Sequence, residues 1–146
     1  MEFEDALFKW VSLQAPITAN IGAPPQIVRF YKGRAPQQTK APFMVQQRNG
    51  REGQLLYCRE DGAVRVSMQI DTYAKDWAGM AAAARALKDA LRPGVLTYPV
   101  WMGDGDSPNV AIKVKAAILE NEFDGEDPDP GLSRRTQLWT FWIWEP

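Results

Sequence analysis

The chain has 146 residues, a length that fits one domain and can bury a substantial core without disulfides or metals. Hydrophobic residues make up 45% of it and charged residues 24%, as in folded globular proteins and unlike disordered chains. Seventeen basic and eighteen acidic side chains give a net charge of -1, which argues against general binding of a nucleic-acid backbone but leaves room for a local basic patch. We therefore expect a single folded domain over residues 1–146.

The sequence also argues against export and membrane insertion. The first five residues carry acids where a signal peptide carries Lys or Arg, and no apolar run approaches the ~20 residues that span a bilayer. The single cysteine, Cys58, cannot form a disulfide within the chain, so nothing requires an oxidising compartment. We expect synthesis in a cytoplasm and no membrane partner.

Two amphipathic helices are predicted. Apolar residues at helical spacing start at Phe3, and Pro16 is expected to end this first helix. The second helix is expected to be capped by Asp76 and to end at residues 92–94, with its apolar residues in one stripe up to Leu91.

Six segments have the composition or alternation of strands. They cover residues 27–31, 43–47, 54–58, 64–71, 110–119 and 135–144, with an Asn-Gly hairpin signal at residues 48–53 and an acidic loop at 121–133. Because helices and strands do not alternate regularly, we expect an α+β fold: an antiparallel sheet with two main helices packed on one face.

The residues that usually carry catalysis are scarce. The chain has no histidine, which removes the commonest general base and metal ligand. Cys58 is interpreted as a half-buried strand residue rather than a nucleophile, and Asp104 and Asp106 as turn acids because the rest of a calcium-loop pattern is missing. No phosphate-binding or dinucleotide motif is present. We expect no enzymatic activity, no cofactor and no metal site.

Two predicted loops carry charged side chains that could make binding selective for one partner. The expected hairpin tip contains Arg48, Arg51 and Glu52. The acidic loop contains Asp124, Glu126, Asp127 and Asp129. These acids could form an acid-base pair, bind a cation or simply be solvated. If the loop has a role, docking to an oppositely charged partner is the one we favour, because charge sets register and partner choice more than affinity.

The last predicted strand is apolar on both faces. Trp139, Phe141 and Ile143 fall on one face, and Leu138, Trp142 and Trp144 on the other. Either the strand is covered on both sides within the subunit, or its second face meets another subunit. Because aromatic side chains are favoured at the centre of interfaces, Trp139, Trp142 and Trp144 are candidate subunit-interface residues.

Several segments in residues 28–91 carry a family resemblance. They are Val28-Arg29-Phe30-Tyr31 followed by Arg34-Ala35-Pro36-Gln37, then Ala41-Pro42-Phe43-Met44-Val45, then Arg65-Val66-Ser67-Met68-Gln69-Ile70-Asp71-Thr72-Tyr73-Ala74, and then the helix end Leu87-Lys88-Asp89-Ala90-Leu91. In order and spacing, they resemble the tail-terminator family of tail-completion proteins in long-tailed phages and gene transfer agents. Residues 99–108 and the acidic loop look like insertions relative to the smallest members of this family.

The resemblance implies a structural virion protein without catalysis or cofactor. Such a protein, made in the bacterial host cytoplasm, assembles with copies of itself, usually as a hexameric ring. The ring caps the major tail-tube protein at the end of the tail tube and presents a head-tail joining surface to the connector. DNA would only pass through its lumen. The two charged loops, with the seven residues named above, are the candidate tube or connector contacts.

Two other interpretations remain open from the sequence. One is another neck or head-completion protein of the same particle, which would more often be a small closed barrel with fewer helices. The other is a small ligand-binding domain or enzyme, which would need a concave pocket with converging polar groups.

Overall fold

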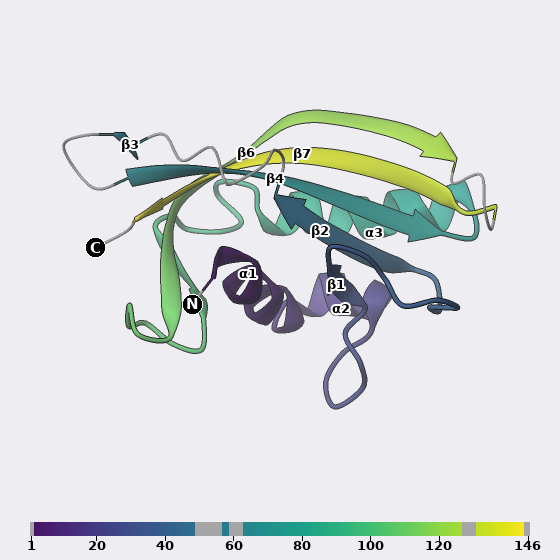
Figure 1. Ribbon diagram of the computed structural model, residues 1–146, viewed down its shortest axis with the longest axis horizontal. Helices are drawn as coiled ribbons and strands as arrows, with labels where there is room; N and C mark the ends of the chain where they lie inside the picture. The colour runs from purple at the N-terminus through teal and green to yellow at the C-terminus, as the bar shows by residue number, and fades with distance from the viewer. Residues whose placement is uncertain (1, 49–56, 59–62, 127–130, 145–146) are drawn as a thin grey trace.

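The computed structural model describes residues 2–48, 57–58, 63–126 and 131–144 (Figure 1). The helices within these ranges are α1 (Phe3–Ser12), α2 (Ala15–Ile21) and α3 (Trp77–Ala90). The strands are β1 (Phe30–Lys32), β2 (Phe43–Arg48), β3 (Tyr57–Cys58), β4 (Ala63–Ala74), β5 (Val100–Gly103), β6 (Ala111–Glu126) and β7 (Ser133–Trp144).

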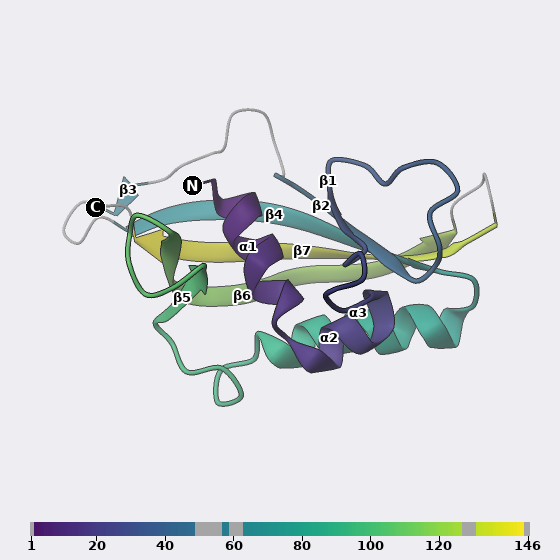
Figure 2. The ribbon, with the colours of Figure 1, turned by 90° about the horizontal axis from the view of Figure 1, so that it is seen from below.

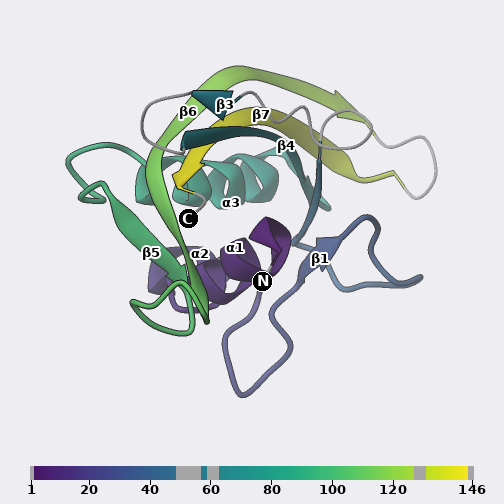
Figure 3. The ribbon, with the colours of Figure 1, turned by 60° about the vertical axis from the view of Figure 1, so that its left-hand side comes forward.

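The strands form one mixed sheet in the order β1-β2-β4-β7-β6-β5, with β3 paired to β4 beside β2. All the pairings are antiparallel except that of β1 with β2, which is parallel. The sheet curls strongly, and its β5 end turns down and around the helices (Figure 3). The result is a half-barrel with a concave and a convex face.

The hydrophobic core lies on the concave side. Along β4, Val64, Val66, Met68 and Ile70 are buried and face the helices, which confirms the predicted alternating strand. Helix α1 crosses beneath the middle strands, while α2 and α3 lie next to each other along one side (Figure 2). The convex face is therefore the one that the helices leave open.

Helix α3 begins as predicted. The Asp76 side chain accepts a hydrogen bond from the Gly79 amide at 2.6 Å, which satisfies one of the free N–H groups of the first turn. Small buried alanines let the helix approach the sheet closely. At this contact the Gln137 amide of β7 donates to the Ala84 carbonyl at 3.2 Å.

The predicted fold class is wrong. In place of an antiparallel α+β sheet with two main helices on one face, the chain forms a mostly β structure in which three short helices lie inside the curve of a mixed sheet. The parallel pairing of β1 with β2 needs a connection that returns along the sheet, and residues 33–42 provide it. Sequence alternation does not report strand direction, so this pairing was not predicted.

Three predicted boundaries are corrected as well. Pro16 does not stop a helix but lies in the first turn of α2, where its missing N–H costs nothing. Residues 121–126 are not loop, because they continue β6 and pair with β7, as in the Asp124–Arg135 pair. Strand β5 was not predicted; it lies in a segment that was interpreted only as an insertion.

Candidate functional site

The helices lie on the concave side of the sheet and leave the convex face uncovered (Figures 1 and 2), and apolar side chains of β6 and β7 lie on that face. Ile118 and Phe123 of β6 are 45% and 48% exposed. Next to them, Leu138 and Trp142 of β7 are half-buried. Contiguous exposed apolar side chains of this kind mark interaction surfaces in soluble proteins. This convex patch is defined by Ile118, Phe123, Leu138 and Trp142.

Strand β6 has a long open edge beside this patch. One edge pairs with β7 over most of the strand, whereas β5 pairs with the other edge only at residues 111–114. Within the described ranges no strand occupies the outer edge of residues 116–126. An open edge presents backbone N–H and C=O groups that another chain can bind.

A groove lies at the opposite side of the convex face, between the sheet and the connection over residues 33–41. Its volume is about 1060 Å³. The floor is formed by the convex side of β2 and β4, where the rings of Phe43 and Tyr73 stack with centroids 4.9 Å apart. Val45 and Leu132 add further apolar lining. The groove thus exists because the parallel β1–β2 pairing sends this connection back over the sheet.

Basic side chains surround the groove. Arg34 and Lys40 come from the connection, Lys75 follows β4, and Arg134 belongs to β7. No described carboxylate forms an ion pair with any of these four. Among the described residues of the lining the single acid is Asp71, so this part of the groove carries an excess of positive charge.

Asp71 is buried in the floor of the groove and is held there by two hydrogen bonds. The Thr136 hydroxyl donates to one of its oxygens at 2.6 Å, and the Gln69 amide donates to the other at 3.0 Å. Both carboxylate oxygens therefore have donors, as a buried charge requires. This arrangement gives Asp71 a structural role between β4 and β7.

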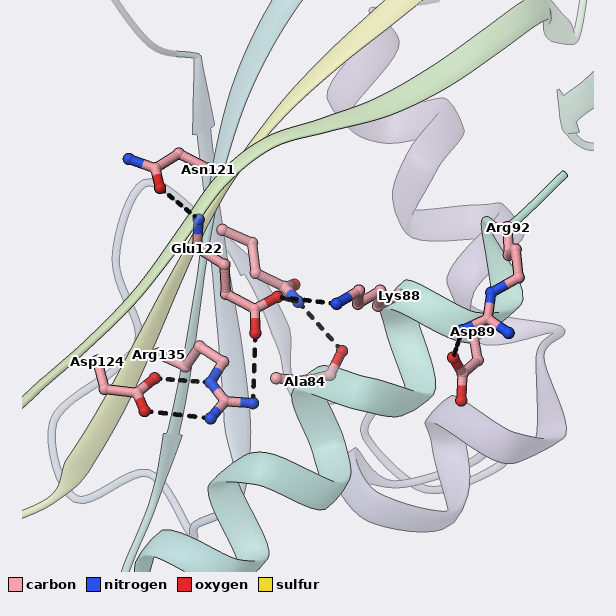
Figure 4. Close-up of polar contacts among 9 residues, drawn as sticks. Ala84, Lys88, Asp89, Arg92, Asn121, Glu122, Asp124 and Arg135 are labelled. Carbon is pink, nitrogen blue, oxygen red and sulfur yellow. Dashed lines mark hydrogen bonds and ion pairs between the residues drawn. The ribbon is translucent and has the colours of Figure 1, made fainter.

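An ion-pair network lies near the far end of β6, on the side of α3 (Figure 4). Arg135 lies between two acids of β6, with its Nε 2.6 Å from Asp124 and an Nη 3.4 Å from Glu122. Lys88 of α3 lies 4.0 Å from Glu122. The Arg135 guanidinium also lies over the exposed Trp77 ring, 5.7 Å from its centroid. The network ties α3 to the β6–β7 hairpin at two places, Trp77 at the start of the helix and Lys88 in its last turn.

The network changes the protonation of its members. The hydrogen bond from Arg135 lowers the pKa of Asp124, and the same bond raises the pKa of Arg135. A lowered carboxyl pKa adds stability that is fully present above the ordinary aspartate pKa and is lost as the pH falls through the folded-state value. Because Asp124 is largely exposed, the contribution is small.

Asp124→Asn is therefore expected to destabilise the protein slightly at neutral pH, with a difference from wild type that shrinks under acid. Urea unfolding at neutral pH and below the ordinary aspartate pKa measures this difference. Asp106→Asn, at an exposed turn acid, is the control and should show no such trend. A difference for Asp124→Asn that is the same at both pH values would contradict the role of charge.

The predicted split of the last strand into two faces is confirmed. Trp139 is 4% exposed and lies in the core beside Phe141, with ring centroids 6.0 Å apart. Trp142 is half-buried on the convex face. Trp144 is 37% exposed at the end of β7, with Lys113 over its ring at 5.8 Å. Of the three candidate interface tryptophans, Trp142 and Trp144 thus reach the surface of the subunit.

The expected hairpin tip is placed only in part. Arg48 ends β2, and its guanidinium pairs with the buried Glu4 of α1 at 2.7 Å and 3.3 Å. This pair joins α1 to the sheet. Arg51 and Glu52 lie outside the described residues.

The acidic segment is also placed in part. Asp124 is in β6 and is bound by Arg135, and Glu126 is the last residue of β6. Asp127 and Asp129 lie outside the described residues. Asp124 lies near the end of β6 and Arg48 at the end of β2, and β4 and β7 separate these two strands in the sheet (Figure 1). The structure therefore does not bring the two charged segments together.

The residues considered for chemistry lie apart. The backbone of Cys58 pairs with Ala63, and Asp104 forms an ion pair with Lys9 of α1. Across residues 2–48, 57–58, 63–126 and 131–144, no group of three or more metal-ligating side chains lies close enough to hold an ion. The helices of these same ranges fall short of the length and apolar content that a bilayer crossing requires.

Of three comparisons with known proteins, only the comparison of structures finds a match, and it concerns the fold. No family model matches the chain, and no curated protein matches its sequence. A chain in a solved structure described as "Virion of native gene transfer agent (GTA) particle" superimposes with a TM-score of 0.65. The match covers 97% of this chain and 93% of that chain at 13% sequence identity. At this identity, the likeness shows that the two chains share a fold.

Sequence reasoning missed the groove and the open β6 edge. Residues 34–37 and 41–42 entered only as part of the family resemblance, and their positive charge was given no role. A useful signal was present in Arg34 and Lys40, which flank a proline- and glutamine-rich stretch between two strands. The open edge had no such signal, because strand order is set by tertiary pairing.

Proposed function

We propose that this protein is a structural component of a phage-like or gene-transfer-agent particle and acts there as the tail terminator. In this role, copies of the chain form a closed ring at the end of the tail tube, a hexamer as in the family that residues 28–91 resemble. The ring presents the joining surface for the head connector. The shared fold with a chain of a gene transfer agent virion supports a virion role, and the resemblance over residues 28–91 supports the terminator.

The observation that carries the proposal is the surface left open after the subunit folds. The convex patch and the outer edge of β6 are unoccupied by described residues, whereas a sheet in a monomer usually covers or shortens such an edge. The groove lies toward the other side of the same face. Different surfaces at the two sides of one subunit favour head-to-tail contacts, which close into a ring when the rotation allows it.

The remaining partners follow from the same role. The tail-tube protein and the connector contact the two ends of the ring, and the charges at Arg48, Arg51 and Glu52 and at Asp124, Glu126, Asp127 and Asp129 set register there. Trp142 and Trp144 contribute to the contact between subunits. DNA passes through the lumen without specific binding, in agreement with the net charge of -1.

Deletion of the protein from its own particle tests the proposal. Without a terminator, tail tubes are expected to have uncontrolled lengths and to remain unjoined to heads, as measured by electron microscopy. Supplying the wild-type chain should restore both properties. Tubes of normal length that fail to join heads would point instead to a neck protein, and normal particles would refute both roles.

A further inference from the structure

We infer that the contact between subunits of the ring is centred on the outer part of β6 of one copy, residues 120–123, which binds the basic groove of the next copy. This inference rests on the proposed function for the existence of a ring. It adds which two surfaces meet and which charges hold them together.

The groove offers unpaired backbone as well as positive charge. Residues 35–41 make no backbone-to-backbone hydrogen bond with any described residue. The Pro36 carbonyl accepts from the Thr39 hydroxyl, and the other N–H and C=O groups of residues 35–41 are able to pair with another extended chain. Arg34 and Lys40 on this connection are exposed, and Arg134 faces them across the groove. The site is therefore suited to an extended segment with acidic side chains.

The outer part of β6 has the complementary features. Its outer backbone edge is open among the described residues, as shown above. Glu120 is exposed and forms no ion pair with a described residue, whereas both oxygens of Asp124 are already bound by Arg135. Phe123 is 48% exposed on the convex face and supplies an apolar anchor for the lining around Val45 and Leu132. An open strand with one exposed acid and one exposed ring thus matches a basic groove with an apolar floor.

The position of the two surfaces explains why the partner is a second copy. The groove lies over β2 and β4 and reaches Arg134 of β7, whereas the open edge of β6 lies on the far side of that strand from β7. A copy that offers β6 to its neighbour still has its own groove free for a third copy. Such a contact is heterologous and propagates around an axis.

The groove chemistry favours a protein segment over a nucleic acid. The rings of Phe43 and Tyr73 stack on each other at an interplanar angle of 15°, so one face of each is already used. The buried Asp71 carboxylate in the floor repels phosphate. Three of the glutamines that line the groove, Gln37, Gln38 and Gln47, are suited to hydrogen bonds with a peptide backbone.

Charge reversal on either side tests the contact. Arg34→Glu alters the groove and Glu120→Arg alters the strand. Each single variant is expected to weaken self-association of the purified chain about tenfold or more in sedimentation experiments. A mixture of the two variants should recover association to within about threefold of wild type, because each then offers the charge that the other needs. The exposed controls Arg85→Glu and Asp106→Arg should match wild type.

Several results would overturn the inference. They are a wild-type chain that stays monomeric at every concentration, single variants that associate normally, and a mixture that fails to recover. Binding of an acidic peptide or single-stranded DNA that depends on Arg34, with unchanged self-association, would assign the groove to another occupant. The proposed function is tested separately: Arg34→Glu particles with tails of normal length would refute this contact and leave the terminator role intact.

Discussion

Phe141→Ala is expected to lower the free energy of unfolding by about 3–5 kcal/mol, because it removes a large fully buried side chain and leaves a cavity. The Phe141 ring lies at the centre of the concave face, 4.8 Å from the ring of Phe3 in α1. Its loss therefore weakens the contact between helix and sheet on which the whole fold depends. Urea unfolding followed by circular dichroism measures the change.

Phe123→Ala is the matched control for that experiment. Phe123 is also a strand phenylalanine, but it is 48% exposed on the convex face. Its truncation is expected to change the free energy of unfolding by no more than about 0.5 kcal/mol. If Phe123→Ala were as destabilising as Phe141→Ala, the convex patch would belong to the core of the subunit and would not be available to a partner.

Ile118→Glu is expected to weaken self-association of the chain about thirtyfold, which corresponds to the ~2 kcal/mol lost at a central interface residue. The substitution places a charge in the convex patch beside the open edge of β6. The subunit itself should stay folded, because Ile118 already contacts solvent. Sedimentation measures association, and unfolding in urea verifies the stability of the subunit.

Ile27→Glu provides the control for the patch. Ile27 is 74% exposed and lies before β1, away from the convex patch. The same chemical change at this position should leave association as in wild type. Equal loss of association in both variants would mean that general surface charge, and not the convex patch, governs the contact.

Local signals in the sequence predicted the local structure. The alternation at residues 64–70 predicted β4, and Asp76 predicted the start of α3. The residues of the last strand were also separated correctly into two faces, although which face is buried was left open and Trp139, a candidate interface residue, lies in the core. In each case the residues involved are close in sequence, so their pattern carries the information.

Long-range pairing decided what the sequence could not show. The acids and glycine at residues 121–126 favour a loop by local preference, yet pairing with Arg134 and Arg135 in β7 keeps them in β6. The parallel pairing of β1 with β2 and the groove that it creates depend on contacts between distant segments. Of the convex patch, the open β6 edge and the groove, the sequence therefore indicated only the first, through a last strand with two apolar faces.

The central claim is that copies of this chain join around an axis at the end of a tail tube. Electron microscopy of isolated tail tubes from its own particle, incubated with the purified protein, tests it most directly. We expect a ring of density at one end of each tube, built from several copies, and its absence with Ile118→Glu. Tube ends that stay bare with the wild-type protein would contradict the claim.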